Sequence, residues 1–336
     1  MSIHVIKPGI FTTIQDKGRT GYQKYGVLTS GAMDPISRRV ANLLTGNHQD
    51  EAVLEITLVG PGPAFTFEED HVIAITGAEV TLEIDGQPAP LWKPIFVRAG
   101  SMLSFGPCKL GCRAYLAVAG GFNVLTVMNS KSTYVRAGIG GYKGRSLQKG
   151  DILQVGHPSI LSHKMARKRS QKTKNTSFAT PDWTVSHYSF LPLRKSPVIR
   201  VLPGRHFPYV EPSSQVAFFE SEFQVTPQSD RMGCRLKGEP IRFKQNLELI
   251  SEAVAFGSIQ IPPDGQPIIL LADRQTTGGY PRIGEIASVD LPLIAQARLG
   301  ATIQFQRIDR HEAEEAIFTQ EEQIRKLVAR LKIEVL

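Results

Sequence analysis

The sequence predicts a mainly β protein with two β-rich domains and a few helices, and three observations carry this prediction. Gly (30) and Pro (22) are frequent enough in 336 residues to end many short strands. In residues 80–84, apolar Val, Leu and Ile alternate with Thr and Glu, the period of a half-buried strand, and the turn-forming pair Asp85-Gly86 follows. Apolar runs flank a second such pair, Asp264-Gly265, which indicates a hairpin. The length suffices for two domains with separate cores.

One helix is predicted within the β-rich first half. Asp34 suits the N-cap, Pro35 the first helical position and Gly46 the position just after the helix. Free N–H groups at this helix N-terminus could hold a carboxylate or phosphate, although Asp34 itself can satisfy those donors. Further strands are expected at 96–106, 112–120 and 152–155, separated by Gly and Pro.

The second half begins after a stretch, 157–185, that is rich in Ser, Lys and Arg and lacks periodic apolar residues, so it is predicted to be a linker. A second β-rich region follows from 198 to 305. An amphipathic helix is predicted near 311–331, with apolar positions Ala316, Ile317, Ile324, Leu327, Val328 and Leu331. The expected domains are 1–160, a basic flexible linker 161–190, and 191–336 with the C-terminal helix.

The net charge of +8 comes mainly from one segment. The acid-free stretch 152–181 holds six basic residues, and without them the chain has 33 basic against 31 acidic residues. No aromatic residues interleave with these charges for base stacking, so a solvated loop is favoured over a nucleic-acid partner.

Other partner and cofactor classes are disfavoured by what the sequence lacks. No apolar run is long enough to span a membrane, and the N-terminus resembles no signal peptide, so we expect a cytoplasmic protein. Three cysteines, Cys108, Cys112 and Cys234, fit neither a disulfide framework nor zinc-ligand spacing, so no metal is expected. There is also no phosphate-loop, nucleophile-elbow or His-Glu-x-x-His motif.

Five polar clusters in turn-rich sequence remain as candidate sites. Each places Asp or Glu beside Arg or amide groups, and such sets bind small polar molecules through paired hydrogen bonds. An Asp beside an Arg should stay ionised, which suits orientation or proton abstraction, whereas the structural alternative is that these pairs lock turns. The clusters are 12–22, 29–34, 229–235, Ser251-Glu252, and Gln260 with Asp264 and 273–280.

At these clusters the sequence resembles the carboxyltransferase A/B region of urea carboxylase, also called allophanate hydrolase subunit 2. Stand-alone members are the C-type subunit of bacterial ATP-dependent 5-oxoprolinase, and the length and basic segment are closest to members that antagonise the kinase inhibitor KipI. The resemblance covers the whole chain. It rests on Gln15-Asp16-x-Gly18-Arg19-x-Gly21, Ser30-Gly31-Ala32-Met33-Asp34, Ser229-Asp230-Arg231-Met232-Gly233 and Gly257-Ser258-Ile259-Gln260 through Tyr280.

The resemblance implies cyclophilin-like β-barrel domains and a small cyclic amide substrate, 5-oxo-L-proline, opened to L-glutamate with ATP. It implies two partners, a KipI-like B-type subunit of 5-oxoprolinase together with its A-type subunit. The ATP site would be shared with or lie on a partner, no biotin is attached to this chain, and we expect no activity of the chain alone. Two alternatives are a regulatory antagonist that binds the KipI inhibitor of a sporulation histidine kinase, and a biotin-dependent carboxyltransferase acting on urea or a similar amide.

Within this frame we assign roles to the clustered side chains. We expect catalytic charges from Asp16, Arg19, Asp230 and Arg231. We expect substrate contacts from Gln15, Tyr22, Ser30, Met33, Asp34, Glu252, Gln260, Asp264, Asp273, Thr276, Thr277 and Tyr280.

One loop departs from the family pattern. Where the family often has Leu-Gly-Ser-x-Ser-Thr, this chain has Met128-Asn129-Ser130-Lys131-Ser132-Thr133. Asn accepts a positive φ more readily than most residues, so we expect the turn to survive at Asn129.

Overall fold

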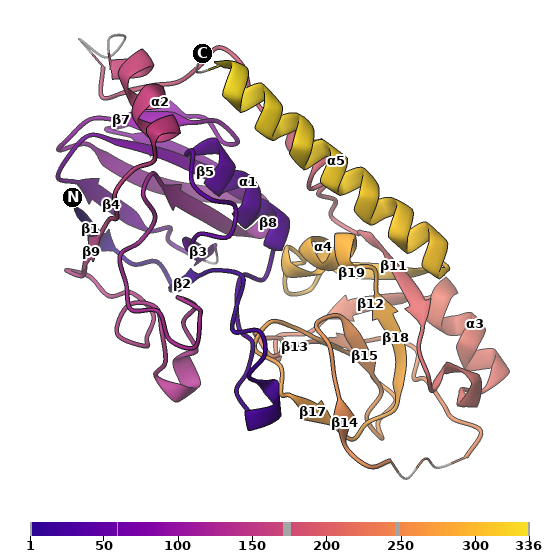
Figure 1. Cartoon of the computed structure of the whole chain (residues 1–336). Helices are drawn as coiled ribbons and strands as arrows, with labels where there is room; N and C mark the ends of the chain where they lie inside the picture. Colours follow the sequence, from indigo (N-terminus) through magenta and orange to yellow (C-terminus); the bar gives the residue numbers. More distant parts are fainter. Residues whose placement is uncertain (1, 59, 171–175, 246, 248, 335–336) are drawn as a thin grey trace. The chain divides into compact units, whose positions relative to one another are not determined.

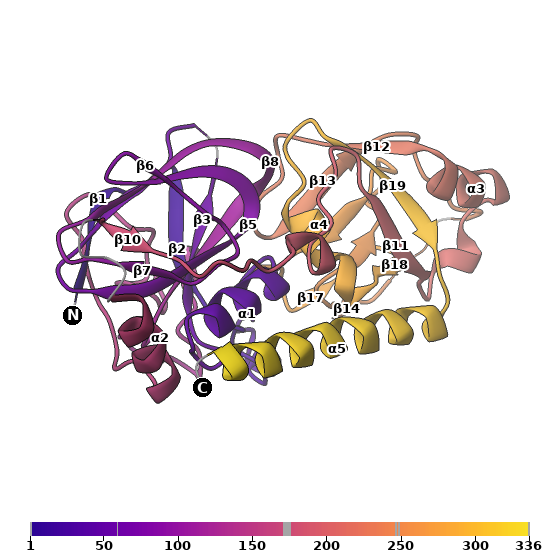
Figure 2. The same ribbon diagram turned by 90° about the horizontal axis from the view of Figure 1, so that it is seen from above.

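A computed structural model describes residues 2–58, 60–170, 176–245, 247 and 249–334 (Figures 1 and 2). The chain divides into two compact units. The first comprises 1–19, 30–192 and 322–336, and the second comprises 20–29 and 193–321. Both units are mainly β, which confirms the predicted fold class.

The first unit is built on a ten-stranded sheet. Its strands are β1 (Ser2–Lys7), β2 (Phe11–Gln15), β3 (Val53–Thr57), β4 (Ala64–Phe67), β5 (His71–Ile84), β6 (Gln87–Ala89), β7 (Ile95–Val97), β8 (Met102–Val118), β9 (Ile152–Gln154) and β10 (Phe178–Ala179). Buried side chains such as Ile14, Leu54, Phe65, Ile75 and Leu116 form one hydrophobic cluster. Short 3-10 helices of this unit are η2 (Val135–Ala137) and η3 (His187–Ser189), whereas η1 (Gln23–Tyr25) belongs to the second unit.

The longest pairing joins β5 and β8 in antiparallel fashion, with three register shifts between Gly77 and Leu82. The sequence predicted separate strands at 96–106 and 112–120, interrupted by Gly and Pro. The structure has β7 and then a single β8 that continues through Gly106, Pro107 and Gly111. Bulges absorb such residues without ending a strand, which is why these Gly and Pro signals misled the prediction.

The predicted turn and helix signals of the first half are confirmed. Asp85 (φ 50°) and Gly86 (φ 76°) both have positive φ between β5 and β6, as a two-residue hairpin turn requires. Helix α1 (Pro35–Leu44) starts at the N-cap Asp34, and Gly46 follows it with φ 76°. The Asp34 carboxylate accepts hydrogen bonds from the Ser37 amide at 2.9 Å and the Ser37 hydroxyl at 2.6 Å, so it satisfies the helix terminus itself.

The stretch predicted as a linker contains a helix. Helix α2 (Ile160–Ser170) begins after Ser159, whose hydroxyl accepts a hydrogen bond from the Ser162 amide, and β10 pairs with β7. The buried side chains of α2 are Ser162, Met165 and Arg169. A buried face with a single apolar residue has no hydrophobic periodicity, so this helix leaves no recognisable pattern in the sequence.

The second unit is a closed barrel with the strand order β11-β18-β15-β16-β13-β12-β19. Its strands are β11 (Val198–Pro203), β12 (Glu222–Val225), β13 (Gly233–Lys237), β15 (Ser258–Gln260), β16 (Ile268–Leu270), β18 (Arg282–Ile286) and β19 (Thr302–Arg307), with β14 (Glu252–Ala253) and β17 (Thr277–Gly278) forming a separate two-stranded ladder. Helices α3 (Pro212–Glu220) and α4 (Leu291–Ala295) and the 3-10 helices η4 (Phe207–Tyr209) and η5 (Ser288–Asp290) complete it. The predicted hairpin is confirmed, since β15 and β16 pair antiparallel on either side of Asp264-Gly265.

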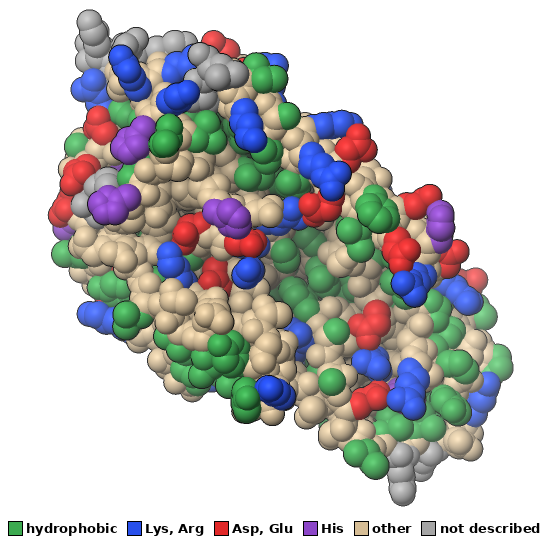
Figure 3. All heavy atoms as spheres, in the orientation of Figure 1, with side chains coloured by type: hydrophobic (Ala, Val, Ile, Leu, Met, Phe, Trp, Pro, Cys, Tyr) green, Lys and Arg blue, Asp and Glu red, His purple; other side chains and the backbone are tan. Residues whose placement is uncertain are grey.

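The C-terminal helix α5 (Arg310–Glu334) confirms the prediction near 311–331. Ile324, Leu327 and Leu331 are buried as expected, whereas Ile317 is 40% exposed. Ion pairs one turn apart, such as Arg310–Glu314 and Lys326–Glu322, lie on its exposed face, and Figure 3 shows charged side chains of both signs along it. None of the helices in the described ranges is both long and apolar enough to cross a membrane.

Two polar clusters as the candidate functional site

The candidate residues are divided between the two units, and we call the two sets the first-unit cluster and the barrel cluster. The first-unit cluster holds Gln15, Asp16, Arg19, Ser30, Met33 and Asp34. The barrel cluster holds Asp230, Arg231, Glu252, Gln260, Asp264, Asp273, Thr276, Thr277 and Tyr280. Tyr22 belongs to the second unit and is half-buried beside η1. The assignment of these residues to catalysis or substrate binding stays a prediction.

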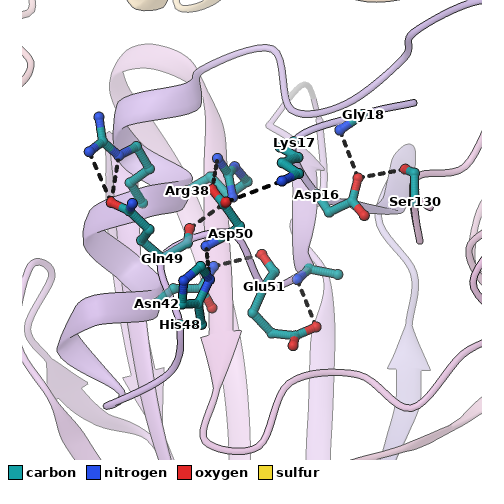
Figure 4. Close-up of polar contacts among 12 residues, drawn as sticks. Asp16, Lys17, Gly18, Arg38, Asn42, His48, Gln49, Asp50, Glu51 and Ser130 are labelled. Atoms are coloured by element: carbon teal, nitrogen blue, oxygen red, sulfur yellow. Dashed lines mark hydrogen bonds and ion pairs between the residues drawn. The ribbon is translucent and has the colours of Figure 1, made fainter. Parts of the chain in front are cut away.

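Asp16 organises the first-unit cluster. It follows β2, and its Oδ1 accepts hydrogen bonds from the Gly18 amide at 2.8 Å and from the hydroxyls of Ser130 and Ser132, both at 2.6 Å (Figure 4 draws the first two). Its Oδ2 accepts from the Lys131 amide at 2.6 Å. Four donors occupy most of the lone pairs of one carboxylate, so Asp16 serves here to hold the 130–133 loop.

The turn that leads into the 130–133 loop is formed by Met128 and Asn129, the residues that depart from the family pattern. Met128 (φ 52°) and Asn129 (φ 60°) both take positive φ, which confirms that the turn survives without glycine at 129. This loop also accepts a hydrogen bond from Arg19, whose Nη2 donates to the Ser132 carbonyl. Arg19 is only 1% exposed, so its guanidinium supports the loop from within.

Gln15, Ser30 and Met33 are buried beside this loop. The Gln15 amide nitrogen donates to the Thr133 carbonyl at 3.1 Å, and the Met33 amide donates to Glu55 Oε2 at 2.7 Å. Ser30 takes a φ of 54°, and the following Gly31 passes so close to Gly18 that a Cβ there would lie 3.0 Å from the Gly18 nitrogen. The Ser-Gly pair therefore lets two loops approach closely.

A group of charged side chains beside this cluster was not predicted from the sequence. Lys17 Nζ lies 3.4 Å from Asp50 Oδ2, Arg38 Nη2 lies 3.6 Å from Asp50 Oδ1, and Lys131 Nζ lies 2.6 Å from Glu51 Oε1. Partial burial acts to raise the pKa of Asp50, but the charges of Arg38 and Lys17 outweigh it and leave the pKa below its usual value. Figure 4 shows Lys17, Arg38 and Asp50 converging beside Asp16.

Tyr115 and the carboxylates of Glu55 and Asp34 are buried together at the start of α1. The Asp34 amide donates to the Tyr115 hydroxyl at 2.9 Å, and Glu55 is 2% exposed. Burial raises the pKa of Tyr115 well above its usual value, and the neighbouring Glu55 and Asp34 carboxylates raise it further. Tyr115 therefore stays a neutral hydroxyl that helps to fix the loop before α1.

In the barrel cluster, Arg231 and Asp273 form a two-point ion pair. Arg231 Nε donates to Asp273 Oδ2 at 2.8 Å and Nη2 to Oδ1 at 3.2 Å, with side chains only 10% and 12% exposed. Asp230 accepts hydrogen bonds from the amides of Met232 at 2.7 Å and Gly233 at 3.2 Å. The Arg231–Asp273 pair thus joins the turn before β13 to the turn after β16, and Asp230 holds the first of these turns.

Two further polar residues of the barrel, Ser258 and Glu285, were not predicted as site residues from the sequence. The Ser258 hydroxyl contacts both carboxylate oxygens of Glu285 at 2.9 Å, and these residues lie opposite each other on β15 and β18. Burial raises the pKa of Glu285, although Ser258 and the charges of Arg282 and Arg274 oppose this. Arg282 also lies 3.5 Å from Glu252, so a carboxyl group suited to proton transfer stands beside cations suited to holding a carboxylate.

Gln260 and the two-glycine segment shape the neighbouring surface. Gln260 is 2% exposed, and its amide nitrogen donates to the Tyr280 carbonyl at 3.2 Å. A Cβ on Gly278 would lie 2.6 Å from that nitrogen, so glycine allows this approach. Thr276 is half-buried and Thr277 is exposed on β17.

A groove of about 690 Å³ opens beside these residues within the second unit. Asp264, Tyr280, Arg242 and Phe243 contribute to its lining. Tyr280 is 47% exposed, and the Asp264 carboxylate accepts a hydrogen bond from the Gln266 amide at 3.0 Å. The groove has the size of a small-molecule site. Among the residues that the structure describes, no group of three His, Cys, Asp or Glu side chains could hold a metal ion.

Comparison with known proteins places this geometry in a family. The chain is 38% identical over 301 residues to the C-type subunit of 5-oxoprolinase from Haemophilus influenzae, covering 90% of this chain and 89% of the relative. It is 36% identical to the C-type subunit of 5-oxoprolinase from Escherichia coli, covering 98% of each chain.

The crystal structure of Kluyveromyces lactis urea carboxylase superposes with a TM-score of 0.84 at 31% identity, over 97% of this chain and 29% of that one. The carboxyltransferase domain family, subdomain A and B, matches residues 25–307. This chain therefore belongs to the carboxyltransferase domain family, subdomain A and B.

Proposed function

We propose that this chain is the C-type subunit of an ATP-dependent 5-oxoprolinase, acting with a KipI-like B-type subunit together with an A-type subunit. The observation that carries the proposal is the identity of 36–38% to two proteins named as the C-type subunit of 5-oxoprolinase, over about nine-tenths or more of every chain compared. A match along nearly the whole length supports the same place in a complex and not only a shared domain. ATP would bind on a partner or at a shared site, because this chain has no phosphate-loop motif.

The barrel cluster offers the chemistry that a lactam substrate needs. In the overall reaction the ring C–N bond breaks, one water supplies the hydroxyl of the new carboxyl group and a proton for the nitrogen, and a second water is consumed as ATP becomes ADP and phosphate. Glu285, with its raised pKa and Ser258 beside it, is suited to move a proton. Arg282, which lies 3.4 Å from Glu285, is suited to hold the substrate carboxylate. The groove lined by Tyr280 and Pro281, the two residues before Arg282 in the chain, has room for a small ring.

The test is lactam-dependent ADP release by this chain mixed with its B- and A-type subunits, with each of the three omitted in turn. We expect release to vanish when this chain is omitted. Glu285→Gln should lower it at least tenfold, and Asp16→Asn should lower it by disordering the 130–133 loop, whereas Glu83→Gln, an exposed acid on β5, should leave it unchanged.

The other outcomes identify the alternatives. If ADP release does not depend on this chain while it still co-purifies with the B-type partner, the regulatory role toward a KipI-type inhibitor becomes the better account. If the mixture instead transfers a carboxyl group with biotin to urea, the carboxyltransferase hypothesis replaces the proposal. Full turnover by both site variants would remove the residue roles but leave the place of the chain in the complex unchanged.

A further inference from the structure

A second cavity lies in the first unit, and none of the residues of the first-unit cluster lines it. It has a volume of about 410 Å³ and is lined by the end of α2, the segment 180–183 and the last turns of α5. We call it the α2–α5 pocket, and its charged and aromatic lining consists of Lys168, Arg169, Asp182, Trp183, Arg330 and Glu334. Figures 1 and 2 both show the end of α5 beside α2.

Arg169 is the most unusual residue of this pocket. It is 5% exposed, and its Nη1 donates to the Met165 carbonyl at 3.0 Å. Its buried Nε finds no acceptor among the residues that the structure describes. Burial lowers the pKa of Arg169, and the charge of Glu334 only partly opposes this. A guanidinium withdrawn from water is stable only when an acceptor faces it.

Trp183 also lines this cavity and carries a second buried donor. Its indole Nε1 is buried and likewise has no acceptor within the described ranges. An indole nitrogen can only donate, so it cannot be satisfied by a neighbouring N–H group. Two buried donors without acceptors on side chains that line one cavity are uncommon, because most buried polar atoms in proteins have a partner.

The remaining charges around the pocket are already partly paired. Arg330 Nη2 lies 3.0 Å from Glu334 Oε1, and Lys168 Nζ donates to the Glu334 carbonyl at 2.6 Å. The charged residues that line the pocket are three cations and two acids, namely Lys168, Arg169, Arg330, Asp182 and Glu334. This net positive charge favours binding of an anion over binding of a cation. Figure 3 shows basic side chains gathered over the region of α2.

We propose that the α2–α5 pocket binds a small molecule bearing a phosphate or carboxylate group, held by Arg169 Nε and Trp183 Nε1. An oxyanion supplies the acceptors that both donors lack, and a guanidinium is well matched to either group. The cavity volume lies within the range of small-molecule sites and exceeds what a lone ion fills. The site is separate from the proposed lactam chemistry and does not depend on it.

The experiment is thermal unfolding of the full chain titrated with inorganic phosphate and, separately, with acetate, at constant ionic strength. We expect a saturable rise in Tm of several degrees with at least one of the two anions, since a ligand that binds only the folded state stabilises it. Comparing the two titrations identifies the group that the pocket prefers.

Two variants and a matched control decide whether the anion acts at this pocket. Arg169→Gln and Trp183→Phe should each shift the midpoint of the titration at least tenfold, and Trp183→Phe keeps the ring in case Arg169→Gln folds poorly. Arg167→Gln removes an exposed cation from the same helix and should respond as the native chain does. A native chain with no saturable response, or an equal response in Trp183→Phe, overturns the proposal.

Discussion

At the scale of the residue, His71 shows how burial turns one side chain into a determinant of acid stability. It starts β5, is 3% exposed, and packs with its ring centre 5.7 Å from that of Phe67. Its buried Nε2 has no hydrogen-bond partner among the described residues. Burial lowers the pKa of His71 to about 4, whereas an exposed histidine titrates near 6.5.

The depressed pKa predicts a loss of stability in acid. Between about pH 6.5 and 4 the unfolded chain binds the proton that the folded chain excludes, so falling pH favours unfolding. The contribution is fully present above pH 6.5, and about 2.5 kcal/mol of it should be lost at pH 4.5. Urea unfolding at pH 7 and pH 4.5 should show this loss in the native chain and in His163→Phe, which alters an exposed histidine, but not in His71→Phe. Equal pH dependence in all three would contradict it.

Residue chemistry also explains which parts of the site could be predicted. Asp34, Asp85-Gly86 and Asn129 were predicted correctly because capping and positive φ are properties of a residue and its immediate neighbours. Ser258 and Glu285 were missed because their contact depends on the register between β15 and β18, which no local pattern reports. The catalytic role predicted for Asp16 stays a prediction, and its four donors become visible only once the 130–133 loop is placed.

At the scale of the element, the β5–β8 pair depends on one glycine at its first register shift. Gly77 has a φ of 93°, and a Cβ there would overlap the Arg113 carbonyl oxygen on β8. Both strands are buried along most of this stretch, so the backbone has little room to move away. The glycine is therefore required by both conformation and space.

Gly77→Ala should accordingly destabilise the chain by about 3 kcal/mol or more, since strain at positive φ adds to a clash with backbone. Gly86→Ala is the matched control, because Gly86 also has positive φ (76°) but a Cβ there meets nothing within 4 Å. It should cost only about 1 kcal/mol. Denaturant unfolding of the two variants measures the difference, and equal losses would show that the close approach to β8 does not matter.

At the scale of the whole molecule, the chain order does not follow the two compact units. Residues 20–29 cluster with the second unit, and 322–336 cluster with the first. A prediction from composition can only place boundaries along the chain, which is why it gave 1–160 and 191–336. Membership in a unit is decided by contacts between residues far apart in sequence, and those contacts leave no signal in one sequence.

Helix α5 illustrates this, because its first residues belong to one unit and its last residues to the other. Its amphipathic pattern predicted burial of Ile324, Leu327 and Leu331, but not which core would receive them. Burying three large aliphatic side chains removes substantial apolar surface from water, at roughly 1.5–3 kcal/mol each. The end of the helix should therefore contribute strongly to the stability of the first unit.

Two substitutions two positions apart test this contribution. Leu331 is 2% exposed and Ile333 is 63% exposed on the same helix. Leu331→Ala should lower the free energy of unfolding by about 2–5 kcal/mol through a lost contact and a residual cavity, whereas Ile333→Ala should change it by less than about 0.5 kcal/mol. Denaturant unfolding gives the global values, and amide exchange along 322–334 shows whether the loss is instead confined to local opening of the helix end. Similar small effects of both substitutions would mean that this end of α5 does not pack as the burial of Leu331 indicates.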